Sequence, residues 1–417
     1  MNNARKERNA EMIVVRRICQ GAVLGLWGVA FLGALGGSLE ILYWFPRASP
    51  LLAISVQLAD RAWLLFFLPA LLIALTGLLS PRFFCGWLCP AGTLIGIADT
   101  LFHRKNSRRR LPSVPGLQRA ALAVILLAAL FGANIAGLLD PLALLTRTVT
   151  STGAPTWQDL HAAAPFLPSR PMWGAGRLAV NLGAAAMLAL MLGLTFFGRR
   201  TWCRTSCPLG AFYGLLGPFA VLKRKVGEGC THCSACANRC PMGAISGDGS
   251  RANTALCISC RQCEASCPKG AVRFAYARDD GAWEEAPPDH SRRRFLKTAG
   301  IALVSLSMAG VLRKMWFSRT ISDELPPNVT DEADFASRCI RCAACVRVCP
   351  TKTLVLAPFS RGPRGLWLPI RDADRPCFFP MCHNCGEVCP TEAIPWILKK
   401  PERESQPAPA DKPEFLG

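Results

Sequence analysis

Histidine is scarce in this chain of 417 residues, which contains only five. None of the five lies in the long apolar stretches of the sequence, so those stretches contain no pair of histidines that could hold a haem. The sequence therefore excludes a transmembrane haem relay of that kind within this chain. The five are His103, His161, His232, His290 and His383.

Acidic residues are also few, with 28 Asp and Glu against 48 Lys and Arg and a net charge of +20. Such an excess of positive charge is typical of proteins that bind nucleic acid or contact a membrane surface. The hydrophobic content of 51% and the mean hydropathy of +0.25 favour the membrane class. We therefore expect an integral membrane protein with no nucleic-acid partner.

Long apolar runs support this expectation, because a helix needs about 20 residues to cross a hydrocarbon core of roughly 30 Å. The sequence predicts an α-helical membrane protein with about five transmembrane helices. The first four runs are followed or preceded by further apolar runs, so none resembles a cleaved signal peptide. The runs are 18–38, 62–80, 118–138, 177–197 and 295–312.

The charges between the runs predict the orientation of the chain, because short cytoplasmic loops are rich in Lys and Arg. The N-terminus and the loop between the second and third runs are strongly basic, and we place both in the cytoplasm. The loops at 39–61 and 139–176 each balance two arginines against two acids, so we place these loops outside. After the fourth run the chain returns to the cytoplasm at Arg199, Arg200 and Arg204.

Two cysteine runs follow, CTHCSACANRCP at 230–241 and CISCRQCEASCP at 257–268. Both have the ferredoxin spacing C-x2-C-x2-C-x3-C-P, in which three cysteines bind one [4Fe-4S] cluster and the fourth binds the other cluster. A pair of structural zinc sites is the less favoured alternative. The predicted ligand sets are Cys230, Cys233, Cys236 and Cys267 for the first cluster, and Cys240, Cys257, Cys260 and Cys263 for the second.

A second pair of runs lies near the C-terminus, CIRCAACVRVCP at 339–350 and CFFPMCHNCGEVCP at 377–390, the latter with a longer first gap. His232 and His383 lie inside ligand loops, where we expect them to tune the clusters by hydrogen bonding instead of binding iron. The same crossing rule predicts Cys339, Cys342, Cys345 and Cys389 for a third cluster, and Cys349, Cys377, Cys382 and Cys385 for a fourth.

Four further cysteines belong to an internal repeat. CGWLCPAGTLIG at 85–96 and CRTSCPLGAFYG at 203–214 match at a constant offset of 118 residues, and the apolar runs before them obey the same offset. We expect each cysteine pair to share one helix face and the pairs to meet near the cytoplasmic interface. Cys85, Cys89, Cys203 and Cys207 could then hold a further metal or cluster, form a redox disulfide, or only pack in the interior.

An export signal stands in the middle of the chain, at SRRRFLK (291–297), directly before the fifth apolar run. It resembles the twin-arginine consensus, which carries folded cargo across a membrane. A plain cytoplasmic anchor is the alternative. No A-x-A cleavage site follows the run, so we expect the fifth helix to stay as an anchor and the second ferredoxin to reach the periplasm.

These features together resemble a known group of proteins. Residues 1 to about 275 are similar to NapH-type polyferredoxins and to the related NosR and CcoG membrane domains, and the remainder is similar to the start of NapG-type periplasmic ferredoxins. The resemblance implies electron transfer from quinol to a periplasmic oxidoreductase. Only about 28 residues follow Cys389, so the second ferredoxin is shorter than the NapG type.

The functional prediction is thus an electron-transfer protein of the bacterial inner membrane with four [4Fe-4S] clusters and quinone as substrate. The alternatives are a CcoG-like assembly or metal-handling reductase that uses the membrane cysteines, and a non-catalytic scaffold; an oligomer is compatible with each. Outer acids and one histidine are candidate proton acceptors for quinol oxidation: Glu40, Asp60, Asp140, Asp159 and His161.

The predicted organisation has five parts. They are a four-helix membrane domain (1–225), a cytoplasmic 2×[4Fe-4S] domain (226–276), a linker with the twin-arginine motif and fifth helix (277–318), a periplasmic 2×[4Fe-4S] domain (319–400) and a disordered tail (401–417). Both cluster domains are expected to be small α+β ferredoxin-like folds.

Overall fold

The structure is a computed structural model that describes residues 2–36, 40–61, 67–102, 115–153, 182–276, 324–358 and 365–395. The predicted twin-arginine motif, the fifth apolar run and the predicted disordered tail lie outside the described residues, as do Asp159 and His161.

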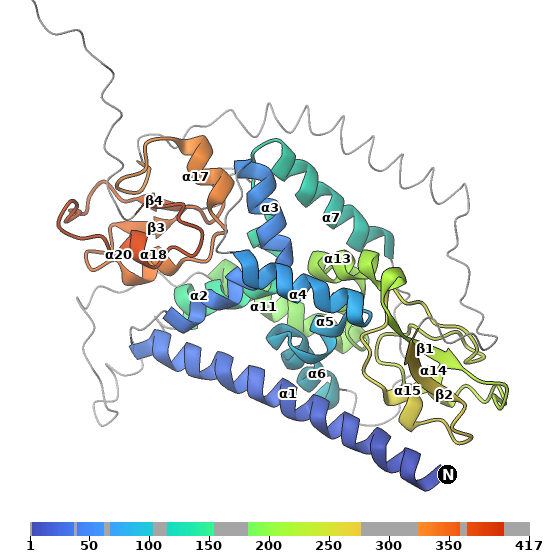
Figure 1. The fold of residues 1–417 in the computed structure, drawn as a ribbon. Coiled ribbons are helices and arrows are strands. Elements are labelled where there is room, and N and C mark those ends of the chain that lie inside the picture. Colours follow the sequence, from blue (N-terminus) through green and yellow to red (C-terminus); the bar gives the residue numbers. More distant parts are fainter. Residues whose placement is uncertain are drawn as a thin grey trace, which may run out of the picture.

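Helices form the middle of the molecule, between two small ferredoxin modules (Figure 1). In chain order they are α1 (Asn2–Gly36), α2 (Glu40–Arg47), α3 (Pro50–Asp60), α4 (Leu68–Leu79), α5 (Phe83–Trp87), α6 (Pro90–Phe102), α7 (Pro115–Leu130), α8 (Ala136–Leu139), α9 (Pro141–Thr148), the π-helical turn η2 (Val149–Gly153), α11 (Leu182–Gly193), the 3-10 turn η3 (Leu194–Phe197), α12 (Thr201–Thr205), α13 (Pro208–Leu216) and the 3-10 turn η4 (Gly217–Phe219).

One helix in the described part of the chain, within α1 at Ala10–Gly33, is long and apolar enough to cross a membrane by itself. The second, third and fourth predicted runs form shorter apolar helices, α4, α7 and α11 with η3. The third run ends early because the chain turns at Gly132, whose φ of 78° is a left-handed conformation that glycine adopts without strain. The predicted outer loop at 39–61 is largely helical, as α2 and α3.

The internal repeat is visible in the backbone. The short helices α5 and α12 begin 118 residues apart, and so do α6 and α13. Arg82 and Arg200 precede the short helices in the same left-handed conformation, with φ of 43° and 50°. The two copies of the cysteine motif therefore have the same local fold.

The expectation that Cys85 and Cys89 lie on one helix face is wrong. Cys85 lies within α5, which ends at Trp87, and Cys89 directly precedes α6. Pro90 has no amide hydrogen to continue the first helix, whereas its fixed φ suits the first position of a new one. The second copy breaks at Pro208 in the same way.

Each ferredoxin module contains a two-stranded antiparallel sheet and short helices that follow the cysteine loops. The first module has β1 (Leu222–Val226), α14 (Ala235–Arg239), α15 (Gln262–Ala265) and β2 (Val272–Tyr276), with Leu222 opposite Tyr276. The second has α17 (Glu332–Arg338), α18 (Ala344–Val348), β3 (Leu354–Leu356), β4 (Pro369–Arg371) and α20 (Asn384–Glu387). Because β1 belongs to the first sheet, the predicted domain boundary at residue 226 is too late by at least four residues.

The two modules lie at opposite ends of the helical domain (Figure 1). The N-terminal half of α1 runs beside the first module and contacts α15. At the other end, α17 packs on α3, and Arg338 of α17 forms an ion pair of 2.8 Å with Asp60. One continuous core of buried side chains extends from the helices into the second module, where it includes Ile340 and Cys342.

Candidate iron-sulfur centres

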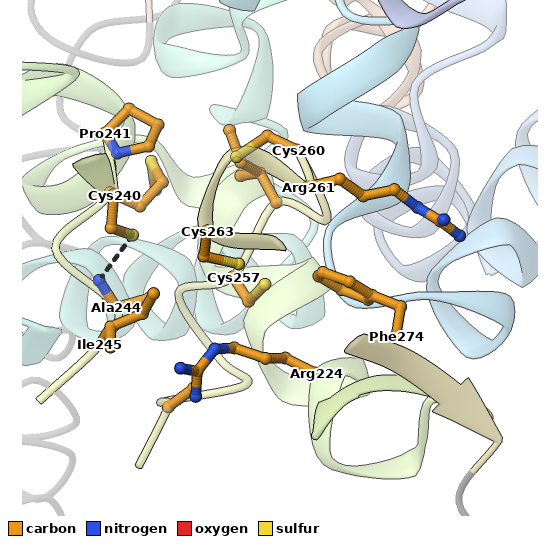
Figure 2. A pocket seen from close by; sticks show the side chains of 13 residues that line it. Arg224, Cys240, Pro241, Ala244, Ile245, Cys257, Cys260, Arg261, Cys263 and Phe274 are labelled. Atoms are coloured by element: carbon orange, nitrogen blue, oxygen red, sulfur yellow. Dashed lines mark hydrogen bonds between the residues drawn. The ribbon is translucent and has the colours of Figure 1, made fainter. Parts of the chain in front are cut away.

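The cysteines predicted for the second cluster line one pocket of the first module (Figure 2). Cys257 and Cys260 lie on one loop, which is wound tightly because Ser259 and Arg261 adopt left-handed conformations, and Cys263 lies in α15 directly after it. Cys240 completes the set from the other motif, and its Sγ accepts a hydrogen bond of 3.3 Å from the amide of Ala244. The structure thus brings together the four thiols that the crossing rule grouped.

The cysteines predicted for the first cluster line a second pocket of the same module, with Cys267 again supplied by the other motif. Arg224 links the two pockets. It lines the first one and donates a hydrogen bond of 3.5 Å from Nη2 to the Sγ of Cys236 in the second. A guanidinium here stabilises negative charge on the thiolates. The pocket is lined by Cys230, Cys233, Cys236 and Cys267, and His232 is not part of the lining.

In the second module, cysteines of both predicted sets lie in one cluster of buried and partly buried side chains, which includes Cys339, Cys345, Cys349, Cys385 and Cys389. Burial is the main cause that raises the pKa of Cys339 to about 11, and the nearby Cys389 acts in the same direction. Burial likewise raises the pKa of Cys385 to about 12, with added contributions from Cys349, Cys382 and Cys377. His383 lies at the start of α20 and packs edge-on against Phe379 at 6.0 Å between ring centroids.

The four remaining cysteines of the repeats, Cys85, Cys89, Cys203 and Cys207, line one pocket, termed here the four-cysteine pocket. Cys89 and Cys207 are each 6% exposed. Each precedes a helix, and its Sγ accepts a 3.3 Å hydrogen bond from the third helical amide, Gly92 or Gly210. The partial positive charge of two helix N-termini therefore favours thiolates here.

At this pocket, one arginine of each repeat contacts the other repeat. Arg82 of the first repeat donates to the backbone carbonyl of Cys203 in the second, at 3.2 Å, and lies against Gly214. Arg200 of the second repeat lies against Gly96 of the first, which corresponds to Gly214 at the same offset of 118. The two repeats therefore form a pseudo-symmetric pair, in which the arginine of each repeat packs on the equivalent glycine of the other.

These arginines were interpreted from sequence as charges that mark the cytoplasmic side, and this interpretation is incomplete. Arg82 is 2% exposed and Arg200 is 4% exposed, and both line the four-cysteine pocket. In the described part of the chain, Arg82 Nε and Arg200 Nη1 are buried without a hydrogen-bond partner. The sequence does contain a signal for this shared role, because each arginine lies three residues before the first cysteine of its motif, Cys85 or Cys203.

The donor sets fit iron-sulfur clusters. Each pocket contains four cysteines, and buried cations or amide hydrogens face the thiols, as an anionic thiolate cluster requires. Within the described residues, no three His, Cys, Asp or Glu side chains converge on a single-ion site. A cubane does not need that convergence, because each thiolate binds a different iron.

Two candidate proton acceptors have structural roles. Asp140 is fully buried, caps α9 by accepting from the amides of Leu142 and Ala143, and accepts from Ser49 Oγ at 2.7 Å. Asp60 pairs with Arg338. Both acids therefore have partners that hold them in place.

Comparison with protein-family models finds three iron-sulfur matches. A model described as a 4Fe-4S binding domain matches twice, at residues 61–109 and 180–227, so that each match contains one Cys-x3-Cys-Pro motif. A second 4Fe-4S binding domain matches 230–244 and 257–271. A 4Fe-4S dicluster domain matches 338–399. Iron-sulfur domains thus cover both modules and both repeats.

Curated relatives include the methylamine utilization ferredoxin-type protein MauN of Paracoccus denitrificans, 29% identical over 261 residues, which are 57% of this chain and 80% of the relative. The ferredoxin-type protein NapH of Escherichia coli is 26% identical over 253 residues, 56% of this chain and 76% of the relative. The ferredoxin-type protein NapG of Escherichia coli is 36% identical over 115 residues, 26% of this chain and 48% of the relative.

No solved structure matches the chain. The resemblance predicted from the cysteine motifs is confirmed by the relatives and the iron-sulfur domains together. The chain is a homologue of the ferredoxin-type proteins named NapH, MauN and NapG.

Proposed function

We propose that this protein carries electrons between the quinol pool of the bacterial inner membrane and a periplasmic oxidoreductase, with four [4Fe-4S] clusters in its two modules. Its homology supports iron-sulfur electron transfer. The observation that carries the proposal further is the position of the two modules at opposite ends of an apolar helical domain (Figure 1). An electron carrier that serves partners on two sides of a membrane needs this arrangement.

The exposed surface of the helices supports insertion into a membrane. Large apolar side chains cover the outer faces of α1, α4 and α11 with η3, where water would make such exposure unfavourable and lipid would not. The exposed residues include Val14, Ile18, Leu26, Val29 and Leu32 on α1, Leu68, Leu71, Leu72, Leu75 and Leu79 on α4, and Leu190, Phe196 and Phe197 on α11 and η3.

The proposed topology places the N-terminus and the first module in the cytoplasm and the second module in the periplasm. Arg16, near the basic N-terminal end of α1, donates to the carbonyl of Gly86 beside the first module. Basic residues at that end favour the cytoplasmic side. The SRRRFLK sequence at 291–297 then serves to export the second module after its clusters have been assembled.

The burial of thiols in the four-cysteine pocket favours electron transfer over a thiol reductase of the CcoG kind. The four-cysteine pocket is closed on one side by Met242 and Ile258 of the first module. A thiol that reduces a metal or another protein needs access to its substrate. Cys85 and Cys203 are partly buried, and Cys89 and Cys207, each 6% exposed, lack that access.

The test is anaerobic mixing of the purified, cluster-loaded protein with a reduced quinone analogue, followed by absorbance bleaching of the clusters. We expect bleaching by quinol, and reoxidation when an oxidised periplasmic extract is added. A protein whose clusters are reduced by dithionite but never by any quinol would refute the quinol assignment. Transfer of electrons to copper ions and not to the extract would favour the metal-handling alternative.

A further inference from the structure

The four-cysteine pocket lies directly beside the cluster loop of the first module. Ile258, between Cys257 and Ser259, lines the pocket. Its carbonyl packs so closely on α5 that a Cβ at Gly86 would overlap it. Trp87 of α5 also donates from Nε1 to the carbonyl of Ser259 at 3.2 Å. The loop that carries Cys257 and Cys260 is thus fixed against the helix that carries Cys85.

The second module makes the corresponding backbone contact at the opposite end of the helical domain. Ile340 follows Cys339 as Ile258 follows Cys257, and its carbonyl packs on α8, where a Cβ at Gly137 would overlap it. In addition, Thr150 Oγ1 donates to the carbonyl of Cys342 at 2.9 Å. Each module therefore rests on the helical domain through the loop of one particular cluster.

The two contacts are joined by a short stretch of chain. Pro141, the first residue of α9, lines the four-cysteine pocket, and Gly137 contacts Ile340 only four residues earlier. Four residues span at most about 14 Å even when fully extended, and less in a helix. Arg147 of the same helix, which is fully buried, donates to the carbonyls of Gly137 at 2.9 Å and Arg341 at 3.4 Å.

We infer that Cys85, Cys89, Cys203 and Cys207 bind a fifth iron-sulfur cluster of the cubane class, and that this site completes an electron path through the protein from the Cys257 loop to the Cys342 loop. This inference rests on the proposed function, because it assumes loaded clusters in both modules. It goes beyond that function by removing the need for quinone to carry electrons across the membrane.

The residues of the pocket suit an anionic cluster. Four thiols supply the ligands, the amides of Gly92 and Gly210 donate to two of them, and the buried Arg82 and Arg200 supply positive charge. When bound, such a cluster accepts and releases single electrons. A disulfide is neutral and would leave the buried guanidinium groups uncompensated.

The balance of the path is simple. A one-electron donor on one face of the membrane is oxidised, a one-electron acceptor on the other face is reduced, and no covalent bond is made or broken. The polypeptide holds the sites in sequence and excludes water between them. One continuous cluster of buried side chains extends from Cys89 and Cys207 to Cys342, and such close packing favours a fixed distance between the sites.

The first test is iron content and electron paramagnetic resonance of anaerobically purified protein. Wild type should hold about twenty iron atoms, four for each of five clusters. Cys89→Ser and Cys207→Ser should each lose about four irons and one resonance while the sixteen ferredoxin ligands remain loaded. Cys19→Ser, a cysteine of α1 outside every cluster motif, is the matched control and should lose none. About sixteen irons in wild type would overturn the fifth cluster.

The second test uses quinone-free liposomes that contain the protein and an enclosed, membrane-impermeant oxidised acceptor such as cytochrome c. Dithionite outside should reduce the enclosed acceptor through wild type and Cys19→Ser, with at least a tenfold loss in Cys89→Ser. Equal rates in all three variants, or in protein-free liposomes, would overturn the path. The quinol assignment fails separately, if quinol does not reduce the clusters while dithionite-driven transfer across the liposome persists.

Discussion

Docking of the first module through the Ile258 carbonyl predicts an unusual effect of a glycine-to-alanine change. In an open helical position this change stabilises a helix by about 1 kcal/mol. At Gly86 the new Cβ would overlap the Ile258 carbonyl, and such overpacking costs about 1–3 kcal/mol. The backbone oxygen of Gly86 also accepts from Arg16 at 3.0 Å and Gln20 at 2.8 Å, so a shift of α5 disturbs α1 as well.

Overpacking therefore outweighs helix propensity at Gly86. The difference between the two terms is a net loss of up to about 2 kcal/mol, which corresponds to up to about 30-fold more of the undocked module. The assay is hydrogen exchange by mass spectrometry on the cluster-loaded protein in detergent, read at the peptide that contains residues 254–261. Gly86→Ala should speed exchange there while the clusters stay in place.

Gly28→Ala is the matched control, because a Cβ at this position of α1 meets nothing within 4 Å. It should leave exchange at 254–261 unchanged and slow exchange slightly within α1. If Gly86→Ala behaves like Gly28→Ala, the carbonyl of Ile258 does not rest on α5 and the docking argument is refuted. Gly137→Ala should act in the same way on the Ile340 loop of the second module.

Further predictions concern export, docking, partner contact and potential. Changing Arg292 and Arg293 to Lys keeps the charge but should protect the second module from protease in spheroplasts, whereas a purely electrostatic anchor predicts no change. Asp60→Asn should weaken docking of the second module by about 1 kcal/mol, since the carboxylate is 3% exposed and pairs with Arg338; faster exchange in α17 would show it. Met381→Glu, at a side chain 86% exposed beside Cys382, should slow reoxidation by periplasmic extract without changing iron content. Arg82→Gln should lower the midpoint potential of the cluster at the four-cysteine pocket, because a nearby cation favours the added electron; an unchanged potential contradicts that role.

Much of the chemistry could be predicted from local spacing. The separation of Cys257, Cys260 and Cys263 defines one loop, and the partner cysteine from the other motif follows from the same pattern. The repeat at an offset of 118 residues predicted equal local folds for both Cys-x3-Cys-Pro motifs, which α5 and α12 show. Such features depend on neighbours in sequence and on ligand geometry, so they can be inferred without tertiary contacts.

The helical domain was harder to infer. Hydropathy predicted spans of similar length, yet α4 and α7 are short and the chain between them forms further helices. Loop arginines were counted only as charges that indicate the orientation of the chain, although Arg147 is fully buried and stacks at 4.0 Å on the ring of Trp367 in the second module. A sequence pattern reports the charge of a side chain, and not whether a distant segment covers it.

Local spacing was enough to predict the ligand sets, because ligands within one loop are placed by covalent geometry, and in the first module each predicted set lines one pocket. Tertiary packing was needed to see that the four repeat cysteines share one pocket, that Arg82 and Arg200 each contact the other repeat, and that Ile258 and Ile340 rest on opposite sides of the helical domain. These relations join residues separated by up to about 200 positions, and they depend on close packing of backbone on glycine, which no local pattern encodes.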